Sequence, residues 1–134
     1  MLTENDVVKY VKLYLENKGY KVNKALSTSE KGIDIEAVHP IKGNCFVEAK
    51  GETSSKITSN RFGKVFNRNQ VKSHIGAALI KSFQTKQKFK GSYVCIALPD
   101  EKNHRDIIDS IKESLEETKI DVFFVQKTGE VIIY

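Results

Sequence analysis

The chain has 134 residues, of which 40% are hydrophobic, and its formal net charge is +5 at pH 7. This length suits one domain with its own core and excludes a second catalytic domain, so we expect residues 1–134 to form a single domain. No stretch approaches the roughly 18 apolar residues of a membrane span, and the first residues carry acids where a signal peptide would be apolar. We therefore expect a cytoplasmic protein without a membrane partner, in which Cys45 and Cys95, both in apolar runs, are buried reduced thiols.

The first half of the chain predicts one helix followed by three strands. Thr3 is a typical N-cap residue, and apolar residues at helical spacing predict a helix over about 3–18. Alternating apolar and polar residues then predict strands over 20–26, 32–38 and 44–50, the last two joined by a short, turn-rich connection. Strands joined so closely pair in antiparallel fashion, so we expect a three-stranded meander.

The second half predicts helices that alternate with strands. A second helix is expected to begin near residues 67–69, with an apolar face made of Val71, Ile75, Ala78, Leu79 and Phe83. The nearly continuous apolar run over 91–98 predicts a central strand that is covered on both faces. A third helix over about 104–117 and strands over 121–126 and 131–134 complete the pattern. This order predicts the α/β class, with a mixed sheet flanked by helices on both faces.

Acidic side chains occur at corresponding positions of two neighbouring predicted strands. The period of two places Asp34 and Glu36 on one strand face, and Glu48 and Lys50 on one face of the next strand. If the connection is symmetric about Ile41, Asp34 lies directly opposite Glu48, with Cβ atoms about 4.5 to 5.5 Å apart. Such a pair either raises the pKa of one carboxyl or recruits a hard cation, Mg²⁺ or Mn²⁺ rather than Zn²⁺. The alternative is a solvent-facing row of charges, with Lys50 in a surface ion pair.

The tripeptides Gly-Ile-Asp (32–34) and Glu-Ala-Lys (48–50) resemble the motif of the PD-(D/E)XK nuclease superfamily. The order of predicted elements over 3–98 resembles the restriction-endonuclease-like αβββαβ core of that superfamily, and the remaining residues form a C-terminal α-β-β extension. The pattern is most similar to the Mrr-type and Holliday-junction-resolvase-like branches, in which G-x-D replaces Pro-Asp. Ile33 occupies the Pro position, and Val8 stands where some resolvase-like members carry an acid.

The resemblance implies a Mg²⁺-dependent deoxyribonuclease, expected to be an endonuclease that hydrolyses DNA phosphodiester bonds in repair, recombination or defence. It implies that Asp34 and Glu48, with the main-chain carbonyl of Ala49, bind Mg²⁺ or Mn²⁺. It further implies that Lys50 orients the attacking water or stabilises charge on the phosphate. We favour these roles over proton abstraction by Lys50, because neighbouring carboxylates stabilise a charged ammonium.

Three further residues are candidates for the same site. Glu4 shares a helix row with Val8 and Val11, so it either adds an acid to the site or complements the helix dipole in the first turn. Gln70 and His74 are four residues apart on the second helix and share a face. They either contact phosphate or water, or form a partly buried pair on the helix surface.

Basic residues are concentrated directly after the Glu-Ala-Lys tripeptide. Residues 51–90 contain nine basic side chains and one acidic, whereas residues 91–134 contain five basic and nine acidic. This predicts either a surface that contacts DNA or a solvated basic face. Phe62 and Phe66 are expected either to stack on bases or to anchor the loop to the core. The proposed DNA-binding residues are Lys56, Arg61, Lys64, Arg68 and Lys72.

The sequence is compatible with two other function classes. The chain is alternatively a catalytically silent nucleic-acid-binding subunit of a larger repair or restriction assembly. The acidic last third alternatively serves as a surface for another protein, unless its charges are simply solvated. Many members of the superfamily that the chain resembles are dimers, as two cuts on a duplex require, so the resemblance leaves a homodimer or larger assembly open, although no predicted strand or helix indicates an interface.

Overall fold

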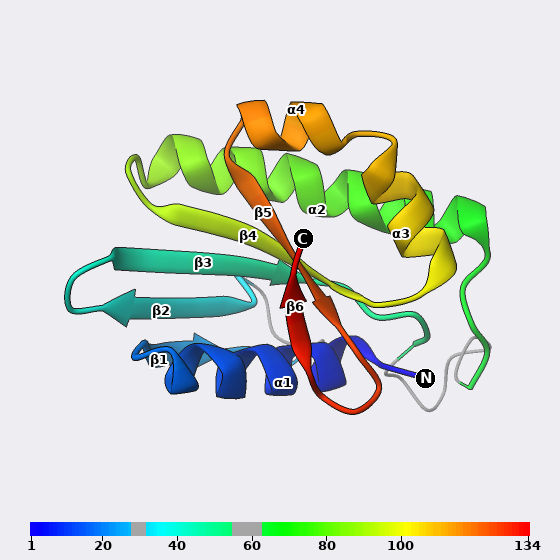
Figure 1. The fold of residues 1–134 in the computed structure, drawn as a ribbon, viewed down its shortest axis with the longest axis horizontal. Coiled ribbons are helices and arrows are strands. Elements are labelled where there is room, and N and C mark those ends of the chain that lie inside the picture. Colours follow the sequence, from blue (N-terminus) through cyan, green and yellow to red (C-terminus); the bar gives the residue numbers. More distant parts are fainter. Residues whose placement is uncertain (28–31, 55–62) are drawn as a thin grey trace.

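The computed structural model describes residues 1–27, 32–54 and 63–134. Helices and strands follow one another in the order shown in Figure 1. The helices are α1 (Glu4–Asn17), α2 (Arg68–Lys88), α3 (Lys102–Asp109) and α4 (Lys112–Glu117). The strands are β1 (Lys21–Ala25), β2 (Ile35–His39), β3 (Gly43–Ala49), β4 (Tyr93–Pro99), β5 (Ile120–Val125) and β6 (Val131–Ile133). Within the described ranges, no helix has the length and apolar character needed to cross a membrane.

The strands form one mixed sheet in the order β1-β2-β3-β4-β5-β6. The first three strands pair in antiparallel fashion, which confirms the predicted meander. Strand β4 runs parallel to both β3 and β5, because a helix connects each of these pairs, and β6 returns antiparallel to β5. The predicted α/β class and the αβββαβ core, which here runs from α1 to β4, are confirmed.

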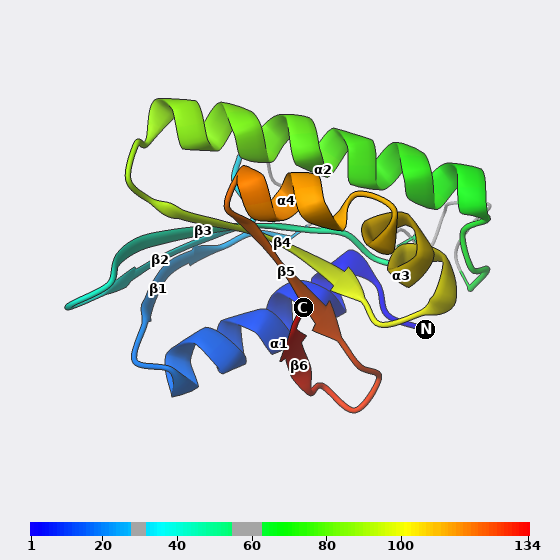
Figure 2. The same ribbon diagram turned by 45° about the horizontal axis from the view of Figure 1, so that its top comes forward.

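Helices cover both faces of the sheet, as Figure 2 shows, with α1 on one side and α2, α3 and α4 on the other. Each face therefore has its own core. The core beneath α1 contains Cys45 and Cys95, which are fully buried and free, as predicted. The opposite core contains the inward residues of α2, α3 and α4, so that β4 is covered on both faces.

The register of β2 on β3 agrees with the prediction, since Val38 pairs with Asn44 and Glu36 with Phe46. The same register continued by two residues sets Asp34 opposite Glu48. However, β2 begins at Ile35, later than the predicted start at residue 32, so Asp34 directly precedes the strand. The reason is the turn at Gly32, whose φ of +127° lies in the region that favours glycine.

The buried row of α2 differs from the prediction in its second half. Phe83 is 45% exposed, whereas Ser82 and Thr85 are buried. A straight helix buries positions that advance by alternate steps of three and four, and Phe83 lies one position off this row. The hydroxyl of Thr85 donates a hydrogen bond to the carbonyl of Lys81 at 2.9 Å, so the buried hydroxyl of Thr85 keeps a hydrogen-bond partner. Helix geometry, rather than the positions of apolar residues in the sequence, therefore decides which side chains of α2 are buried here.

The helix predicted over 104–117 is two helices, α3 and α4, which meet at Ser110 and Ile111. The hydroxyl of Ser110 donates to the carbonyl of Ile107 at 2.6 Å and so competes with the helical ladder at this point. The break allows Ile108 of α3 and Leu115 of α4 to pack into the same core.

Candidate active site

The start of α1 is fastened to the chain that follows β3. The buried carboxylate of Glu52 accepts a hydrogen bond from the main-chain N–H of Leu2 at 3.1 Å, and the N–H of Glu52 donates to the carbonyl of Leu2 at 2.8 Å. Gly51 lies so close to α1 that a Cβ there would be 2.4 Å from the nitrogen of Glu4. These contacts bring the first turn of α1 to the end of β3, where the Glu-Ala-Lys tripeptide lies.

The acids Asp34 and Glu48 are both buried, with exposed fractions of 8% and 6%. The Oδ2 atom of Asp34 accepts a hydrogen bond from the main-chain N–H of Ala49 at 2.8 Å, which fixes it beside Glu48. Burial, and then the negative charge of Asp34, raise the pKa of Glu48 to about 7. The alternative of a solvent-facing row of charges is therefore wrong for this pair.

Each carboxylate oxygen of Glu48 faces a different lysine. Nζ of Lys50 lies 3.9 Å from Oε2, but this is not the surface ion pair of the alternative, since the side chain of Glu48 is only 8% exposed. Nζ of Lys81, from α2, lies 3.3 Å from Oε1 and also donates a hydrogen bond to the carbonyl of Gly32. Among the described residues, Oε1 of Glu48 is buried without a hydrogen-bond partner, so its contact with Lys81 is an ion pair alone.

Glu4 is half-buried and belongs to the same electrostatic cluster. Burial, and then the charge of Asp34, raise the pKa of Glu4, while Lys50 and Lys81 act in the opposite direction. The capping of α1 is done by other groups, because the carboxylate of Asp6 accepts the N–H of Thr3 at 2.9 Å. The structure thus places Glu4 beside the acidic pair.

The two candidates on α2, Gln70 and His74, make different contacts in the structure. The side chain of Gln70 accepts a hydrogen bond from the N–H of Asn67 at 2.8 Å and so caps the helix. The ring of His74 packs edge-on against Phe66, with ring centroids 4.6 Å apart. Burial, and then the positive charge of Lys50, lower the pKa of His74. Phe66 also packs on the core of its face, which supports its predicted role as an anchor.

The acidic pair offers a divalent cation two hard oxygen ligands. In the described part of the chain there is no group of three or more His, Cys, Asp or Glu residues able to hold a metal. Mg²⁺ keeps several of its waters in proteins and is commonly held by one or two carboxylates. Asp34 and Glu48 fit this requirement, and the buried Oε1 of Glu48, which lacks a hydrogen bond, has capacity for such a cation. The predicted contribution of the Ala49 carbonyl stays a prediction.

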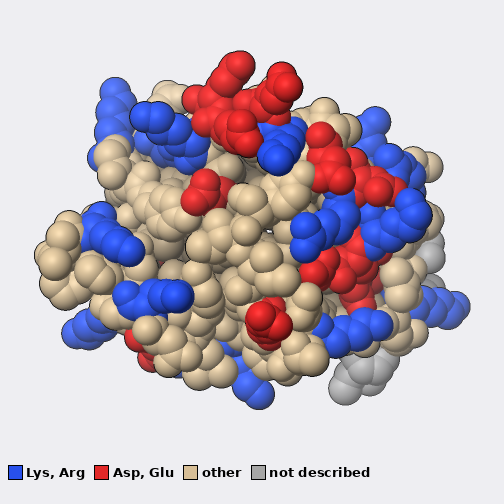
Figure 3. Space-filling view, viewed as in Figure 1, with Lys and Arg blue, Asp and Glu red and all other residues tan. Residues whose placement is uncertain are grey.

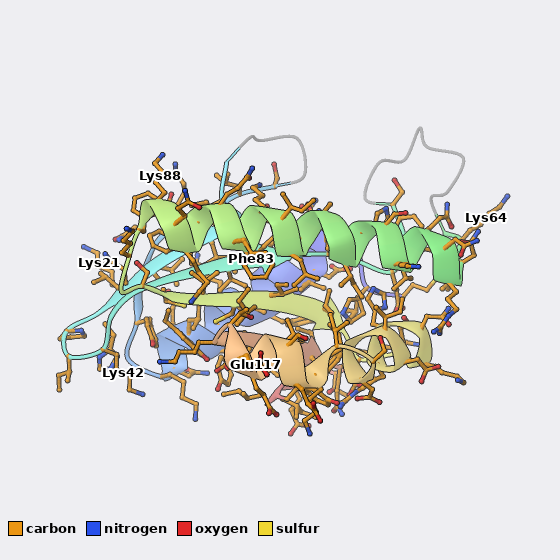
Figure 4. The ribbon with its side chains drawn as sticks, turned by 90° about the horizontal axis from the view of Figure 1, so that it is seen from above. Lys21, Lys42, Lys64, Phe83, Lys88 and Glu117 are labelled. Carbon is orange, nitrogen blue, oxygen red and sulfur yellow. The ribbon has the colours of Figure 1, made fainter. Side chains whose placement is uncertain are left out.

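Basic side chains are also exposed at the start of α2 and just before it, and Arg68 and Lys72 border the groove between α2 and α3. Lys64, Arg68 and Lys72 are exposed near the start of the helix, and Arg68 forms an ion pair with Asp106 at 3.6 Å. Figure 4 shows Lys64 and Lys88 at opposite ends of α2. Figure 3 shows acidic side chains gathered over α4 instead. The predicted residues Lys56, Arg61 and Phe62 lie outside the described residues.

Lys81 is the site residue that the sequence analysis did not identify. It lies seven residues after His74, which is two helical turns, so the two side chains project from the same side of α2. This spacing was the available signal. It becomes informative only when the direction in which α2 crosses the sheet is known.

The fold is shared with solved structures at low sequence identity. An XisH family protein from Nostoc punctiforme aligns with a TM-score of 0.58 and 15% identity, over 95% of this chain and 96% of that protein. An fdxN element excision controlling factor protein from Anabaena variabilis aligns with a TM-score of 0.59 and 16% identity, over 96% of both chains. No family model and no curated protein matches the sequence. These similarities establish the fold alone.

Proposed function

We propose that this chain is a Mg²⁺-dependent nuclease that hydrolyses DNA phosphodiester bonds, with Asp34, Glu48 and Lys50 as its catalytic residues. The observation that carries the proposal is the buried pair of acids, flanked by two lysines, at the end of β3. Burying two like charges side by side is destabilising, so such a pair is expected where a cation makes use of it.

In this proposal the two acids hold the cation, and the main-chain N–H of Ala49 keeps Asp34 in position. A bound Mg²⁺ supplies a water of lowered pKa and neutralises charge on the phosphate oxygens. The ammonium of Lys50, whose side chain is 21% exposed, reaches the solvent side of the site and stabilises charge on the phosphate. Glu4, in the first turn of α1, adds a third carboxyl group close to the pair.

The basic surface near the start of α2 binds the DNA backbone. Lys64, Arg68 and Lys72 supply charge without reading sequence, because contacts to phosphate position a duplex and contacts to bases specify it. One structural neighbour is described as an excision controlling factor for the fdxN element. That description belongs to the neighbour, and the proposal for this chain rests on its own residues.

The proposal is tested by incubating the whole chain with Mg²⁺ or Mn²⁺ and four substrates: plasmid, linear duplex, single-stranded DNA and RNA. We expect metal-dependent cleavage of DNA, and we expect Asp34→Asn and Lys50→Ala each to lower the rate by about 10²- to 10⁴-fold, because each removes a charge used in the reaction. Cleavage products are resolved on gels and their ends identified by susceptibility to phosphatase.

The matched control is Glu36→Gln, on the strand that follows Asp34. Glu36 is half-buried and pairs with Lys24 at 3.3 Å, so its removal should leave cleavage unchanged. Equal cleavage by the wild type and by both site variants would contradict the proposal. DNA binding without cleavage under either metal would favour the catalytically silent binding subunit instead.

A further inference from the structure

Lys81 joins three parts of the site through one ammonium group. Its Nζ donates a hydrogen bond to the carbonyl of Gly32, in the turn before Asp34, and lies 3.3 Å from Oε1 of Glu48 on β3. The side chain itself comes from α2, whereas Lys50 directly follows β3. A single positive charge thus bridges the turn, the strand and the helix.

The ammonium of Lys81 occupies a position that a metal cation bound to the two acids would need. Oε1 of Glu48 is buried and has no hydrogen bond within the described ranges, and Lys81 is the cation that faces it. Oε2 of the same carboxylate faces Lys50 at the longer distance of 3.9 Å. A divalent cation on Oε1 would therefore meet the charge of Lys81 first, and two cations repel strongly at such separations.

Lys81 is able to leave this position without disturbing the fold. Its side chain is 39% exposed, and a lysine carries its charge on a flexible four-carbon stem. The neighbouring positions Ser82 and Thr85, by contrast, are buried and hold α2 on the sheet. Displacement of the ammonium therefore requires rotation of one side chain and no movement of the helix.

We propose that Lys81 is a built-in substitute for the metal, which neutralises Glu48 until a divalent cation binds and is then displaced to the phosphate of the bound DNA strand. This inference rests on the proposed nuclease function. It gives the two lysines different tasks: Lys50 faces the phosphate throughout, whereas Lys81 exchanges a carboxylate for a phosphate. In the metal-free protein, Lys81 thus keeps the charges of Asp34 and Glu48 from lying together without a compensating positive charge.

The test is Mn²⁺ binding to the whole chain at about pH 8, measured by electron paramagnetic resonance or calorimetry, with Lys81→Met and the matched variant Lys88→Met. Removing the competing charge is expected to tighten Mn²⁺ binding by roughly 3- to 30-fold in Lys81→Met. Lys88 is exposed at the end of α2, and its variant should bind Mn²⁺ as the wild type does. Lys81→Arg keeps the charge and should also stay close to wild-type affinity.

A second measurement separates this role from a merely structural one. At saturating Mn²⁺, single-turnover cleavage by Lys81→Met should be slower by about 10- to 100-fold although the metal is held more tightly, because a phosphate contact is lost. A structural role would weaken both properties together. Circular dichroism and the melting temperature establish that the variant is folded.

The outcomes distinguish failure of this inference from failure of the proposed function. Unchanged or weaker Mn²⁺ binding by Lys81→Met, with a wild type that binds Mn²⁺, would overturn the substitution by Lys81 and leave the nuclease proposal standing. Tighter binding with unchanged cleavage would overturn the contact to phosphate. The absence of Mn²⁺ binding in both proteins would overturn the metal site and this inference with it.

Discussion

The folded protein disfavours the negative charge of Glu48. Burial and the neighbouring Asp34 raise its pKa to about 7 from an ordinary value of 4.5. Between these two pH values the folded chain holds a proton that the unfolded chain has released, so the free energy of unfolding falls as pH rises through this window. A bound divalent cation would remove this penalty by replacing the proton.

We therefore predict that Glu48→Gln is more stable than the wild type at about pH 8 without divalent metal, by on the order of 1–3 kcal/mol. At about pH 5 the two proteins should have similar stability, because the wild-type carboxyl is then protonated. Urea denaturation with chelator at both pH values measures the difference. Glu36→Gln, on the neighbouring strand, should show no such pH-dependent gain, and an equal gain there would contradict the account.

The central site residues were predictable from sequence because strands have a simple period. A period of two and a short connection were enough to place Asp34 opposite Glu48, and Lys50 follows on the same face. Lys81 was not predictable in the same way. Its contact with Glu48 depends on how α2 crosses the sheet, which is decided by packing of whole elements.

At the scale of elements, the site depends on a close approach between α1 and the end of β3. Gly51 is the residue that permits this approach, since a Cβ there would lie 2.4 Å from the nitrogen of Glu4 and 2.6 Å from the carbonyl carbon of Thr3. Both neighbours are backbone atoms, which cannot rotate away. The helix must shift if any side chain is added.

We predict that Gly51→Ala lowers the free energy of unfolding by about 1–3 kcal/mol or more, because the added methyl forces α1 from the sheet. The proposed nuclease activity should fall as well, since Glu4 moves with the helix. Chemical denaturation and the cleavage assay measure the two effects on the same preparation.

Gly76→Ala is the matched control, because a Cβ at Gly76 would meet nothing within 4 Å. This glycine lies inside α2, where alanine is the better helix former, so stability should rise by roughly 0.5–1 kcal/mol. Loss of stability in this variant, or none in Gly51→Ala, would contradict the packing described for these two elements.

The elements themselves were predictable where local pattern and packing agree. The start of α1 at a Thr3 cap is an example, since the cap is local in sequence. The buried face of α2 was predictable only in part. The sequence pattern placed the apolar Phe83 on that face, whereas in the straight helix the polar Ser82 occupies the buried position. The break at Ser110 was missed because the residues on each side fit one helical period.

At the scale of the whole molecule, charge is separated along the chain into a basic segment over 51–90 and an acidic segment over 91–134, and Figure 3 shows acidic side chains gathered over α4 on the face that it draws. This separation explains how a modest net charge of +5 can accompany a surface suited to phosphates. The arrangement of the sheet was predictable from sequence, because short connections give antiparallel neighbours and helical crossovers give parallel ones. The position of the charged segments relative to Asp34 and Glu48 could not be predicted from the sequence, because it depends on how the helices pack on the sheet.

We predict that DNA binding by the whole chain weakens steeply with salt, and that Lys64→Ala and Lys72→Ala each reduce the slope of log affinity against log salt by about 0.9, one released counterion per lost phosphate contact. Fluorescence anisotropy across a salt series, without divalent metal, measures the slope. Lys127→Ala, on the turn between β5 and β6, removes an exposed lysine outside the basic segment and should leave the slope unchanged. A uniform effect of all three variants would contradict a localised DNA surface.

The most direct test of the central claim is anomalous diffraction at the manganese edge from crystals of the whole chain soaked in Mn²⁺. We predict a peak within coordination distance of the carboxylates of Asp34 and Glu48, with Nζ of Lys81 displaced from Oε1 of Glu48. Manganese bound elsewhere, with the ion pair between Lys81 and Glu48 unchanged, would contradict it.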